Sequence, residues 1–201
     1  MTVRTIYLVR HGQYDQTVPY LGVPGGNLTP LGRDQARYVA ETFVNYSINS
    51  IHCSTMPRAI ETSHIIARKL NKEVKKSDLL QEGVPSIPSH LKNEFEKLMK
   101  ERPDLTHEKI KHNLERFEKA YATYFYSPST LEDDTIDILV CHGNIIRFFL
   151  CKVLGIHIDN WVKFDVNNGG ISCVTIKDNG MMQILHMNES KHIPLNKQTF
   201  T

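Results

Sequence analysis

The chain has 201 residues and a mass of 23.1 kDa, and this length predicts a single domain that spans residues 1–201. Hydrophobic residues make up 40% and charged residues 23%, which excludes a disordered or fibrous protein. The 24 Lys and Arg residues against 22 Asp and Glu leave a net charge of +2, too small for the basic face that nucleic-acid binding requires. We therefore expect a globular protein with no nucleic-acid partner.

The sequence holds no segment of roughly 20 apolar residues, so we expect no membrane-spanning helix in this chain. Its N-terminus also lacks the apolar stretch and the cleavage site of a signal peptide. Four cysteines are spread along the chain without a CxxC pair, at Cys53, Cys141, Cys151 and Cys173. A chain of this length does not need disulfides to form a core, so we expect reduced thiols and a cytoplasmic location.

Apolar runs and capping residues predict alternating strands and helices in the first half of the chain. Thr5–Val9 is a short apolar, β-branched run of the kind found in strands buried on both faces. Thr29 and Pro30 then form the start signal of a helix, whose apolar residues continue at helical spacing to Phe43. The further elements predicted here are a strand over Ser50–Cys53, a helix over Pro57–Leu70 and a strand over Glu73–Leu80.

The second half of the chain begins with a segment of different character. Three prolines and Gly83 mark residues 82–103 as irregular or as short helical pieces. The elements predicted beyond it are a helix over Thr106–Phe125, a strand over Thr135–Cys141, a helix over His142–Leu154 that ends at Gly155, and two strands over Gly170–Ile176 and Met181–Met187 joined by a turn. This alternation predicts a three-layer α/β/α sandwich with a mostly parallel central sheet, helices on both faces, and antiparallel last strands.

Three of the predicted strands are followed at once by Arg or His. Arg10 and His11 follow the first strand, Arg58 lies just beyond the second at the start of a helix, and His142 follows the strand over Thr135–Cys141. Ligands of an open α/β sheet bind outside the carboxyl ends of its strands, so we expect these side chains to converge. Helix N-termini at the same edge add N–H groups that favour an anion. The pattern predicts a phosphate-binding site.

Two other interpretations start from the same residues. With ten His in the chain, one His after a strand carries little weight, and Arg10 alone would fit an ordinary salt bridge at a strand end. His11 and His142 together with Cys53 and Cys141 would fit a zinc site, because imidazole and thiolate are zinc ligands. Two arginines in the same pocket would repel a divalent cation and suit a dianion, which favours the phosphate site.

Four ordered sequence blocks resemble one known family. Leu8–Gly12 (LVRHG) resembles the RHG signature of the histidine phosphatase (phosphoglycerate mutase-like) superfamily. Leu28–Ala36, Ser54–Thr62 and Cys141–Asn144 match its next three blocks in the same order. The resemblance covers about residues 5–177, and it implies the phosphoglycerate mutase-like form of the predicted α/β/α sandwich.

Within this superfamily, four shorter stretches are most similar to the serine/threonine protein phosphatases of the phosphoglycerate mutase family member 5 type. These stretches are RHGQY, LLQEGVP, CHGNIIR and VNNGGIS. The resemblance implies a phosphoric monoester hydrolase that removes phosphate from phosphoserine or phosphothreonine in proteins. A phosphatase or phosphoglycerate mutase acting on small phosphorylated metabolites is the alternative, since it would share every catalytic residue. An inactive binding protein on this fold is disfavoured, because the residues that carry the catalytic roles of the family are all present.

Several catalytic roles of the family carry over by position. His11 matches the nucleophile, whose neutral imidazole nitrogen attacks phosphorus and becomes phosphohistidine. Arg10 and Arg58 match the guanidinium groups that clamp the phosphate oxygens and offset the charge of the transition state. Because these arginines supply the positive charge, the resemblance implies that the reaction needs neither a metal ion nor another cofactor.

The resemblance assigns roles to four further residues. His142, in its protonated form, matches the second imidazole, which binds the phosphoryl group during its transfer. Gly143 and Asn144, at the start of the helix that follows, would complete the binding pocket for the substrate. Glu82 matches the general acid, which protonates the leaving alkoxide and later activates the water molecule that attacks phosphohistidine.

The sequence departs from the family in two respects. Where the true mutases carry an Asn six residues after the nucleophile, this chain has Thr17, and residues 13–26 lack the Trp of the mutase substrate loop. Phosphatases of the member 5 type usually carry an N-terminal membrane anchor and an acidic, aromatic oligomerisation segment, and neither precedes Arg10. We therefore expect a soluble relative or, if an anchor has been removed, a mitochondrial protein. Assembly into a homodimer stays open.

Overall fold

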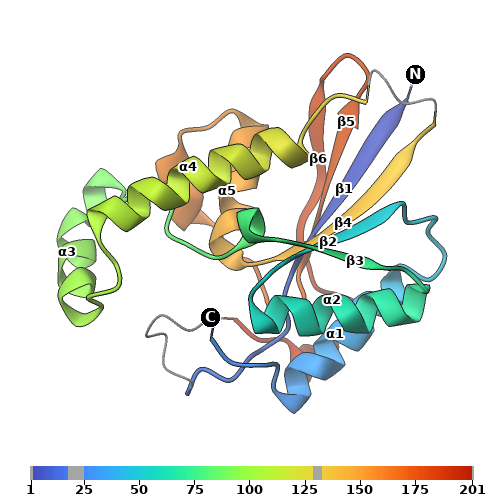
Figure 1. Cartoon of the computed structure of the whole chain (residues 1–201), viewed down its shortest axis with the longest axis horizontal. Helices are drawn as coiled ribbons and strands as arrows, with labels where there is room; N and C mark the ends of the chain where they lie inside the picture. The colour runs from blue at the N-terminus through green and yellow to red at the C-terminus, as the bar shows by residue number, and fades with distance from the viewer. Residues whose placement is uncertain (1, 18–24, 129–132, 201) are drawn as a thin grey trace.

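A mixed β-sheet forms the centre of the fold in the computed structural model, which describes residues 2–17, 25–128 and 133–200. Over these residues the sheet has six strands, in the order β3-β2-β4-β1-β5-β6 (Figure 1). Their bounds are Val3–Arg10 for β1, Ser50–Ser54 for β2, Val74–Ser77 for β3, Thr135–Cys141 for β4, Ile171–Lys177 for β5 and Met182–Glu189 for β6.

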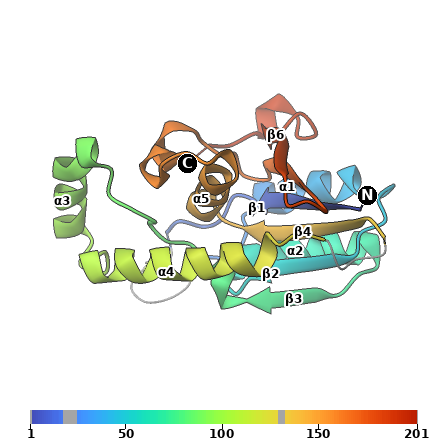
Figure 2. The same cartoon turned by 90° about the horizontal axis from the view of Figure 1, so that it is seen from above.

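Helices lie on both faces of this sheet. Their bounds are Pro30–Thr42 for α1, Pro57–Leu70 for α2, Lys92–Glu101 for α3, His107–Tyr124 for α4 and Gly143–Leu154 for α5, with 3₁₀ turns over Asp78–Leu80 (η1), Ser89–Leu91 (η2), Ile158–Lys163 (η3) and Leu195–Lys197 (η4). The helix α3 stands apart from the sheet at the far end of α4, as Figure 2 shows. Among the described residues, no helix combines the length and the apolar character needed to cross a membrane.

The strand register brings the carboxyl ends of three strands to one edge of the sheet. β4 runs parallel to β1, with Cys141 opposite Arg10, and parallel to β2, with Val140 opposite Cys53. β3 runs parallel to β2 at the edge of the sheet. β5 runs antiparallel to β1 and forms a hairpin with β6. The prediction of a mostly parallel sheet with antiparallel pairing of the last strands is therefore confirmed.

Alternation along the strands divides the core into two halves. Ile6 and Leu8 of β1 belong to a cluster with α4 and α5 that includes Phe117 and Phe148. Val9 belongs to the other cluster, which lies against α1 and α2. Because the central strands are buried on both faces, they need the continuous apolar runs that the sequence contains. The predicted three-layer α/β/α sandwich is confirmed by these two clusters on opposite faces of one sheet.

Local signals in the sequence set the ends of the helices. The Thr29 hydroxyl oxygen accepts a hydrogen bond from the Gly32 N–H at 3.0 Å, and Pro30 is the first residue of α1, as predicted. Gly155 ends α5 in the left-handed conformation, with φ of 65°, which a glycine adopts without strain. Gly180 has φ of 81° in the predicted turn between β5 and β6.

Most predicted elements agree with the structure to within two residues at each end, and two predictions differ from it by more. The third strand is shorter than Glu73–Leu80, because the Ser77 hydroxyl accepts a hydrogen bond from the Leu79 N–H and turns the chain into η1. Part of the segment over 82–103 is a regular helix, α3, of ten residues. The prolines of this segment, at positions 85, 88 and 103, lie outside α3, so they delimit the helix and do not interrupt it.

The four cysteines are all buried and none of them forms a disulfide, in agreement with the expectation of reduced thiols. Burial raises the pKa of the Cys151 and Cys173 thiols to about 11 each. Both side chains are therefore protonated at neutral pH, and they behave as small apolar groups of the core.

A buried ion pair joins the N-terminal end of the central strands to α4. Arg4 of β1 pairs with Asp137 of β4, with 2.6 Å between Nη2 and Oδ2, and both side chains are at most 9% exposed. Arg4 also donates to the carbonyl oxygen of Tyr124, and Ser50 of β2 donates to the second carboxylate oxygen of Asp137. Removal of one partner from such a pair leaves an uncompensated buried charge.

Replacement of Asp137 by Ala is expected to lower the free energy of unfolding by about 3–5 kcal/mol, because Arg4 stays buried without its carboxylate. Urea unfolding followed by circular dichroism measures this loss. Glu96→Ala serves as the control, since it breaks the exposed pair with Lys92 on α3 and is expected to cost less than about 0.5 kcal/mol. Similar small losses in the two variants would contradict the assignment.

Candidate active site

Side chains with chemical function meet at the carboxyl edge of β1, β2 and β4. Arg10 ends β1 and His11 follows it, Arg58 lies in the first turn of α2, and His142 caps the N-terminus of α5 after β4. All four side chains are buried, with exposed fractions between 0% and 6%. The predicted convergence of these residues at one edge of the sheet is what the structure shows.

The His11 ring is held at both nitrogens. Its Nδ1 lies 2.7 Å from the Gly12 carbonyl oxygen, which can only accept, so Nδ1 carries the proton. Its Nε2 accepts a hydrogen bond from Arg58 Nε at 3.1 Å. Burial, assisted by the charges of Arg58 and Arg10, holds the pKa of His11 well below its ordinary value. The imidazole is therefore neutral at neutral pH, with its lone pair on Nε2.

The two arginines have partners that replace water. The Arg58 guanidinium lies over the Tyr14 ring, with 4.4 Å between Cζ and the ring centroid, and its Nη2 donates to the Met56 sulfur at 3.5 Å. Arg10 donates through Nη1 to the Val166 carbonyl oxygen. Burial lowers the pKa of Arg10, and the carboxylate of Glu82 partly offsets this effect. Two guanidinium groups beside a neutral imidazole suit an anionic ligand.

His142 lies beside His11, with 5.0 Å between the ring centroids. Its Nε2 is 2.8 Å from the Ser54 hydroxyl oxygen, which already accepts a hydrogen bond from the Met56 N–H at 3.2 Å. The Ser54 hydroxyl can donate its proton to His142 Nε2, and in that arrangement the neutral ring carries its own proton on Nδ1. Among the described residues, this buried Nδ1 has no hydrogen-bond partner.

The protonation state expected for His142 from the sequence is not the one that this environment favours. Burial, together with the nearby charges of Arg58 and Arg10, holds the pKa of His142 well below its ordinary value, so the ring is neutral. A neutral ring can still supply the expected donor, because the tautomer that accepts from the Ser54 hydroxyl carries an N–H at Nδ1. Ser54 was missed in the sequence, although its place at the end of a buried strand was a usable signal.

Glu82 joins the site from the loop after η1. Its Oε2 accepts a hydrogen bond from the Asn144 N–H at 3.3 Å, and its Oε1 accepts one from the Gly83 N–H at 3.0 Å. The carboxylate is thus held at the N-terminus of α5, of which Gly143 is the first residue. The side chain of Asn144 accepts from Arg147 Nη1 at 3.2 Å, so Asn144 contributes its backbone to Glu82 and its side chain to Arg147.

Arg116 of α4 holds the loop that carries Glu82. Its guanidinium donates to the carbonyl oxygens of Leu79, Gln81 and Glu82 at 3.2, 2.6 and 3.0 Å. These are carbonyls at and just after the end of η1, where a helical turn leaves acceptors without partners. Sequence reasoning missed Arg116, since it stands among other charged residues on a helix and carries no local signal of this contact.

The zinc interpretation is not supported by the arrangement of its candidate ligands. Within the described ranges, no group of three or more His, Cys, Asp or Glu side chains could hold a metal ion. Cys53 belongs to the core half next to α1 and α2, whereas Cys141 belongs to the half next to α4 and α5. The two thiols therefore lie on opposite faces of the sheet and cannot join His11 and His142 in one site.

The substrate loop over residues 13–26 is only partly described, since residues 18–24 lie outside the described ranges. The hydroxyl of Thr17, the position at which the mutases carry Asn, donates to the Asp15 carboxylate at 2.6 Å. Thr17 is exposed and engaged with a neighbour in its own loop.

This arrangement can perform one kind of chemistry well. A neutral imidazole offers its lone pair, two guanidinium groups and an imidazole N–H offer donors to anionic oxygens, and a carboxylate lies at the same helix N-terminus. Such a set suits nucleophilic attack on a phosphorus atom that bears negative oxygens, because the donors are already oriented.

Comparison with known proteins points the same way. The model of the histidine phosphatase superfamily (branch 1) matches residues 6–190. The mitochondrial serine/threonine-protein phosphatase Pgam5 of Caenorhabditis elegans is 33% identical over 206 residues, covering 98% of this chain and 67% of its own length. The mitochondrial serine/threonine-protein phosphatase PGAM5 of Homo sapiens is 32% identical over 209 residues, covering 98% and 66%. The chain spans about two thirds of the length of these relatives.

A solved structure of similar fold has a different activity in its name. The crystal structure of phosphoglycerate mutase from Plasmodium falciparum has a TM-score of 0.64 and 26% identity to this chain. The match covers 97% of this chain and 96% of that one, so it includes the sheet and both helical layers.

The lowered pKa values of His11 and His142 predict a loss of stability in acid. An unfolded imidazole takes up a proton below about pH 6.5, whereas the folded rings stay neutral to lower pH. This contribution to stability is complete above about pH 6.5 and is lost as pH falls, by up to about 1.4 kcal/mol per pH unit for each ring. Denaturant unfolding between pH 7 and pH 5 measures the slope.

The variant His142→Gln is expected to show a shallower loss of stability over this pH range than the unmodified chain. His112→Gln, on the exposed face of α4, is the control and is expected to keep the slope. An unchanged slope in His142→Gln would mean that His142 titrates alike in the folded and the unfolded chain.

Proposed function

The chain belongs to the histidine phosphatase superfamily (branch 1), and on that premise we propose that it hydrolyses phosphoserine and phosphothreonine in proteins through a phosphohistidine on His11. The observation that carries this proposal is the His11 ring, with a proton fixed on Nδ1 and a lone pair on Nε2 next to two guanidinium groups. The names of the curated relatives support protein substrates.

In the first step, His11 Nε2 attacks the phosphorus atom of the phosphoserine or phosphothreonine. A bond forms between Nε2 and phosphorus, and the bond between phosphorus and the side-chain oxygen of the substrate breaks. The incoming phosphoryl oxygens compete for the Nε–H of Arg58, which now donates to Nε2, so binding of the substrate releases the attacking lone pair. Nδ1 keeps its proton throughout and donates a hydrogen bond to the Gly12 carbonyl oxygen.

Arg10, Arg58 and His142 bind the three phosphoryl oxygens during transfer. The guanidinium groups bring positive charge, and His142 brings the N–H at Nδ1 that its bond to Ser54 leaves available. These donors are buried, and their strength in a dry site exceeds that of the same groups in water. Because Arg10 and Arg58 offset the transition-state charge, the proposed reaction does not depend on a metal ion.

Glu82 moves protons in both steps. In the first step it donates a proton to the leaving oxygen, so that the serine or threonine departs as a neutral alcohol. In the second step its carboxylate accepts a proton from a water molecule, whose oxygen attacks phosphohistidine and releases inorganic phosphate and neutral His11. The N–H groups of Gly83 and Asn144 orient the carboxylate for this exchange.

The alternative substrate class is small phosphorylated metabolites, with phosphatase or mutase activity. Its support is the similarity to phosphoglycerate mutase from Plasmodium falciparum. The Thr17 hydroxyl, bound within its own loop at the position of the mutase Asn, favours hydrolysis over mutase activity. The curated relatives are named mitochondrial, so a mitochondrial location is an alternative to the cytoplasmic one expected from the sequence.

The expected substrate preference is tested by comparing kcat/KM for phosphoserine and phosphothreonine peptides with kcat/KM for a panel of phosphorylated metabolites, while mutase activity on 3-phosphoglycerate is followed in parallel. Turnover of peptides with little turnover of metabolites supports the proposal. Transfer of phosphate within 3-phosphoglycerate at a higher rate than its hydrolysis would support the alternative.

The variant His11→Ala is expected to lose turnover and to stay folded, because it removes the nucleophile from a loop next to the sheet. The unmodified enzyme, quenched during turnover of a ³²P-labelled phosphopeptide, is expected to carry acid-labile, alkali-stable phosphate. Arg58→Ala is expected to slow turnover about 10²–10³-fold, as removal of one oxyanion donor does. Activity lost in EDTA and restored by zinc or magnesium would instead demand a metal ion.

The variant Glu82→Gln is expected to slow phosphoserine peptides more than p-nitrophenyl phosphate in single-turnover release of the first product. The serine alkoxide is a poor leaving group and needs the proton, whereas p-nitrophenolate leaves without one. Because water attack is also impaired, phosphoenzyme is expected to accumulate with the aryl substrate. Equal slowing of both substrates would mean that Glu82 does not protonate the leaving group.

A further inference from the structure

The peptide that orients His11 is itself held by a buried side chain of α1. The Gly12 carbonyl, which accepts from His11 Nδ1, belongs to the same planar peptide unit as the Gln13 N–H. This N–H donates to Gln35 Oε1 at 2.7 Å, and Gln35 is 0% exposed. Since the N–H and C=O of one trans peptide point in opposite directions, the bond to Gln35 aims the Gly12 carbonyl at His11.

The other end of the Gln35 amide binds the C-terminal segment. Its Nε2 donates to the Lys197 carbonyl oxygen at 2.8 Å and to the Thr199 hydroxyl oxygen at 2.9 Å. With both donors and its acceptor engaged, Gln35 has one orientation that satisfies every contact. The C-terminal segment therefore decides which way the Gln35 amide faces.

A second path leads from the same segment back to His11. The Thr199 hydroxyl donates to Asn168 Oδ1 at 2.9 Å, and Asn168 Nδ2 donates to the His11 carbonyl oxygen at 3.2 Å. The Thr199 carbonyl oxygen accepts from the Asn168 N–H at 3.1 Å. Asn168 is 0% exposed, like Gln35. Asn168 thus binds the peptide before Gly12 and Gln35 the peptide after it, and both amides contact the Thr199 hydroxyl.

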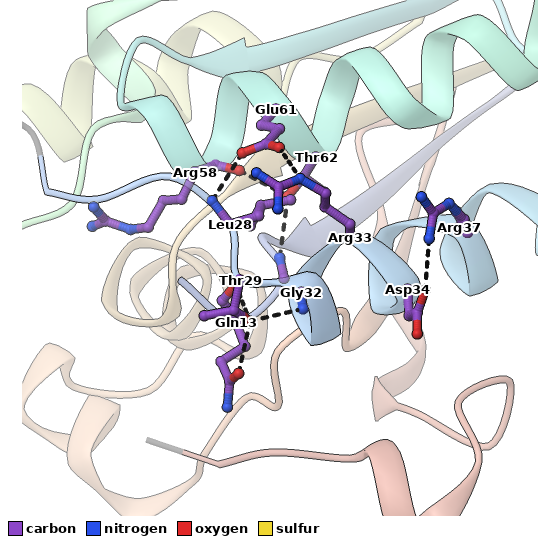
Figure 3. Close-up of polar contacts among 11 residues, drawn as sticks. Gln13, Leu28, Thr29, Gly32, Arg33, Asp34, Arg37, Arg58, Glu61 and Thr62 are labelled. Carbon is purple, nitrogen blue, oxygen red and sulfur yellow. Dashed lines mark hydrogen bonds and ion pairs between the residues drawn. The ribbon is translucent and has the colours of Figure 1, made fainter. Parts of the chain in front are cut away.

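Other hydrogen bonds hold the rest of the loop after His11, and they involve neither Gln35 nor Asn168. The side chain of Thr29 donates to Gln13 Oε1 at 2.8 Å (Figure 3). The Gly12 N–H donates to the Thr62 hydroxyl oxygen at 3.1 Å. These bonds fix Gln13 and the peptide before Gly12, so the peptide after Gly12 depends on Gln35.

We propose that Gln35, locked by Thr199 of the C-terminal segment and acting together with Asn168, is a positioning residue that keeps His11 in the tautomer with its proton on Nδ1. It touches no substrate, and its effect reaches the reaction through the Gly12 carbonyl. The consequence is that docking of residues 197–199 sets the fraction of enzyme whose nucleophilic lone pair is on Nε2. This inference rests on the proposed phosphohistidine function.

The test compares Gln35→Met, Thr199→Val and Thr199→Ser with the unmodified chain. Methionine keeps the volume of Gln35 and removes its hydrogen bonds, valine removes only the Thr199 hydroxyl, and serine restores it. We expect Gln35→Met to slow single-turnover formation of phosphohistidine about 10–100-fold, the usual range for loss of a partner that orients a functional His. Thr199→Val is expected to show a smaller loss in kcat with little change in KM, and Thr199→Ser to recover the rate.

Thr42→Val is the matched control, because among the described residues the Thr42 hydroxyl bonds only to the Val39 carbonyl oxygen of its own helix. It is expected to keep the unmodified rate. ¹⁵N NMR of the His11 ring without substrate gives a readout that does not need activity: we expect Nδ1–H in the unmodified chain and a mixture of tautomers in Gln35→Met and Thr199→Val.

Unmodified rates and an Nδ1–H signal in Gln35→Met and Thr199→Val would overturn the inference. If Gln35→Met does not fold, the Thr199 pair decides, since it lies in a half-exposed terminal segment. If the unmodified chain forms no phosphohistidine, the proposed function fails, and the ring tautomers still decide whether Gln35 positions His11.

Discussion

Burial of two guanidinium groups beside two imidazoles is the constraint on which the rest of the site depends. Buried guanidinium groups need partners that replace water. Arg10 donates to the Val166 carbonyl oxygen, and Arg58 contacts the Met56 sulfur and the face of Tyr14. Burial, together with the charges of the two arginines, lowers the pKa of both imidazoles and keeps them neutral, so the buried site does not accumulate four positive charges. One neutral ring can then act as a nucleophile and the other as a hydrogen-bond donor.

Close contact between two backbones places α1 against the loop that follows His11. A Cβ atom at Gly12 would lie 2.3 Å from the Gly32 carbonyl oxygen, and one at Gly32 would lie 1.9 Å from the Gln13 carbonyl oxygen. Only glycine allows this approach at either position. Because Gln35 follows Gly32 by three residues, its side chain projects from the same face of α1 toward the loop. The glycines thus bring Gln35 within reach of Gln13.

The sequence was informative wherever a signal is local. The caps at Thr29 and Gly155, and the strand over Thr135–Cys141, could be predicted because a few neighbouring residues determine them. The convergence of the site residues followed from the geometry of parallel strands. The neutral state of His142 could not be predicted, since it depends on charges brought close by folding.

Contacts across long sequence separations left no local signal. Arg116 reaches Glu82 across 34 positions, and Gln35 reaches Thr199 across 164. The residues around Gln35 and Arg116 predict a helix, but they do not predict which distant residue each side chain contacts. A single sequence gives the residue types of such pairs and the elements that carry them, but the pairing itself comes only with the packed fold.

His11 and the segment that carries Glu82 are held in place by different parts of the fold. The chain from His11 to Gln13 is held by three buried side chains, Gln35 of α1, Thr62 of α2 and Asn168 of the loop before β5. The segment from Glu82 to α3 is bound by Arg116, which donates to the Glu82 carbonyl oxygen, and by Trp161, whose indole donates to the Ser86 carbonyl oxygen at 3.3 Å. No residue of α3 is buried. A substitution on the exposed surface of α3 therefore leaves the contacts that orient His11 in place.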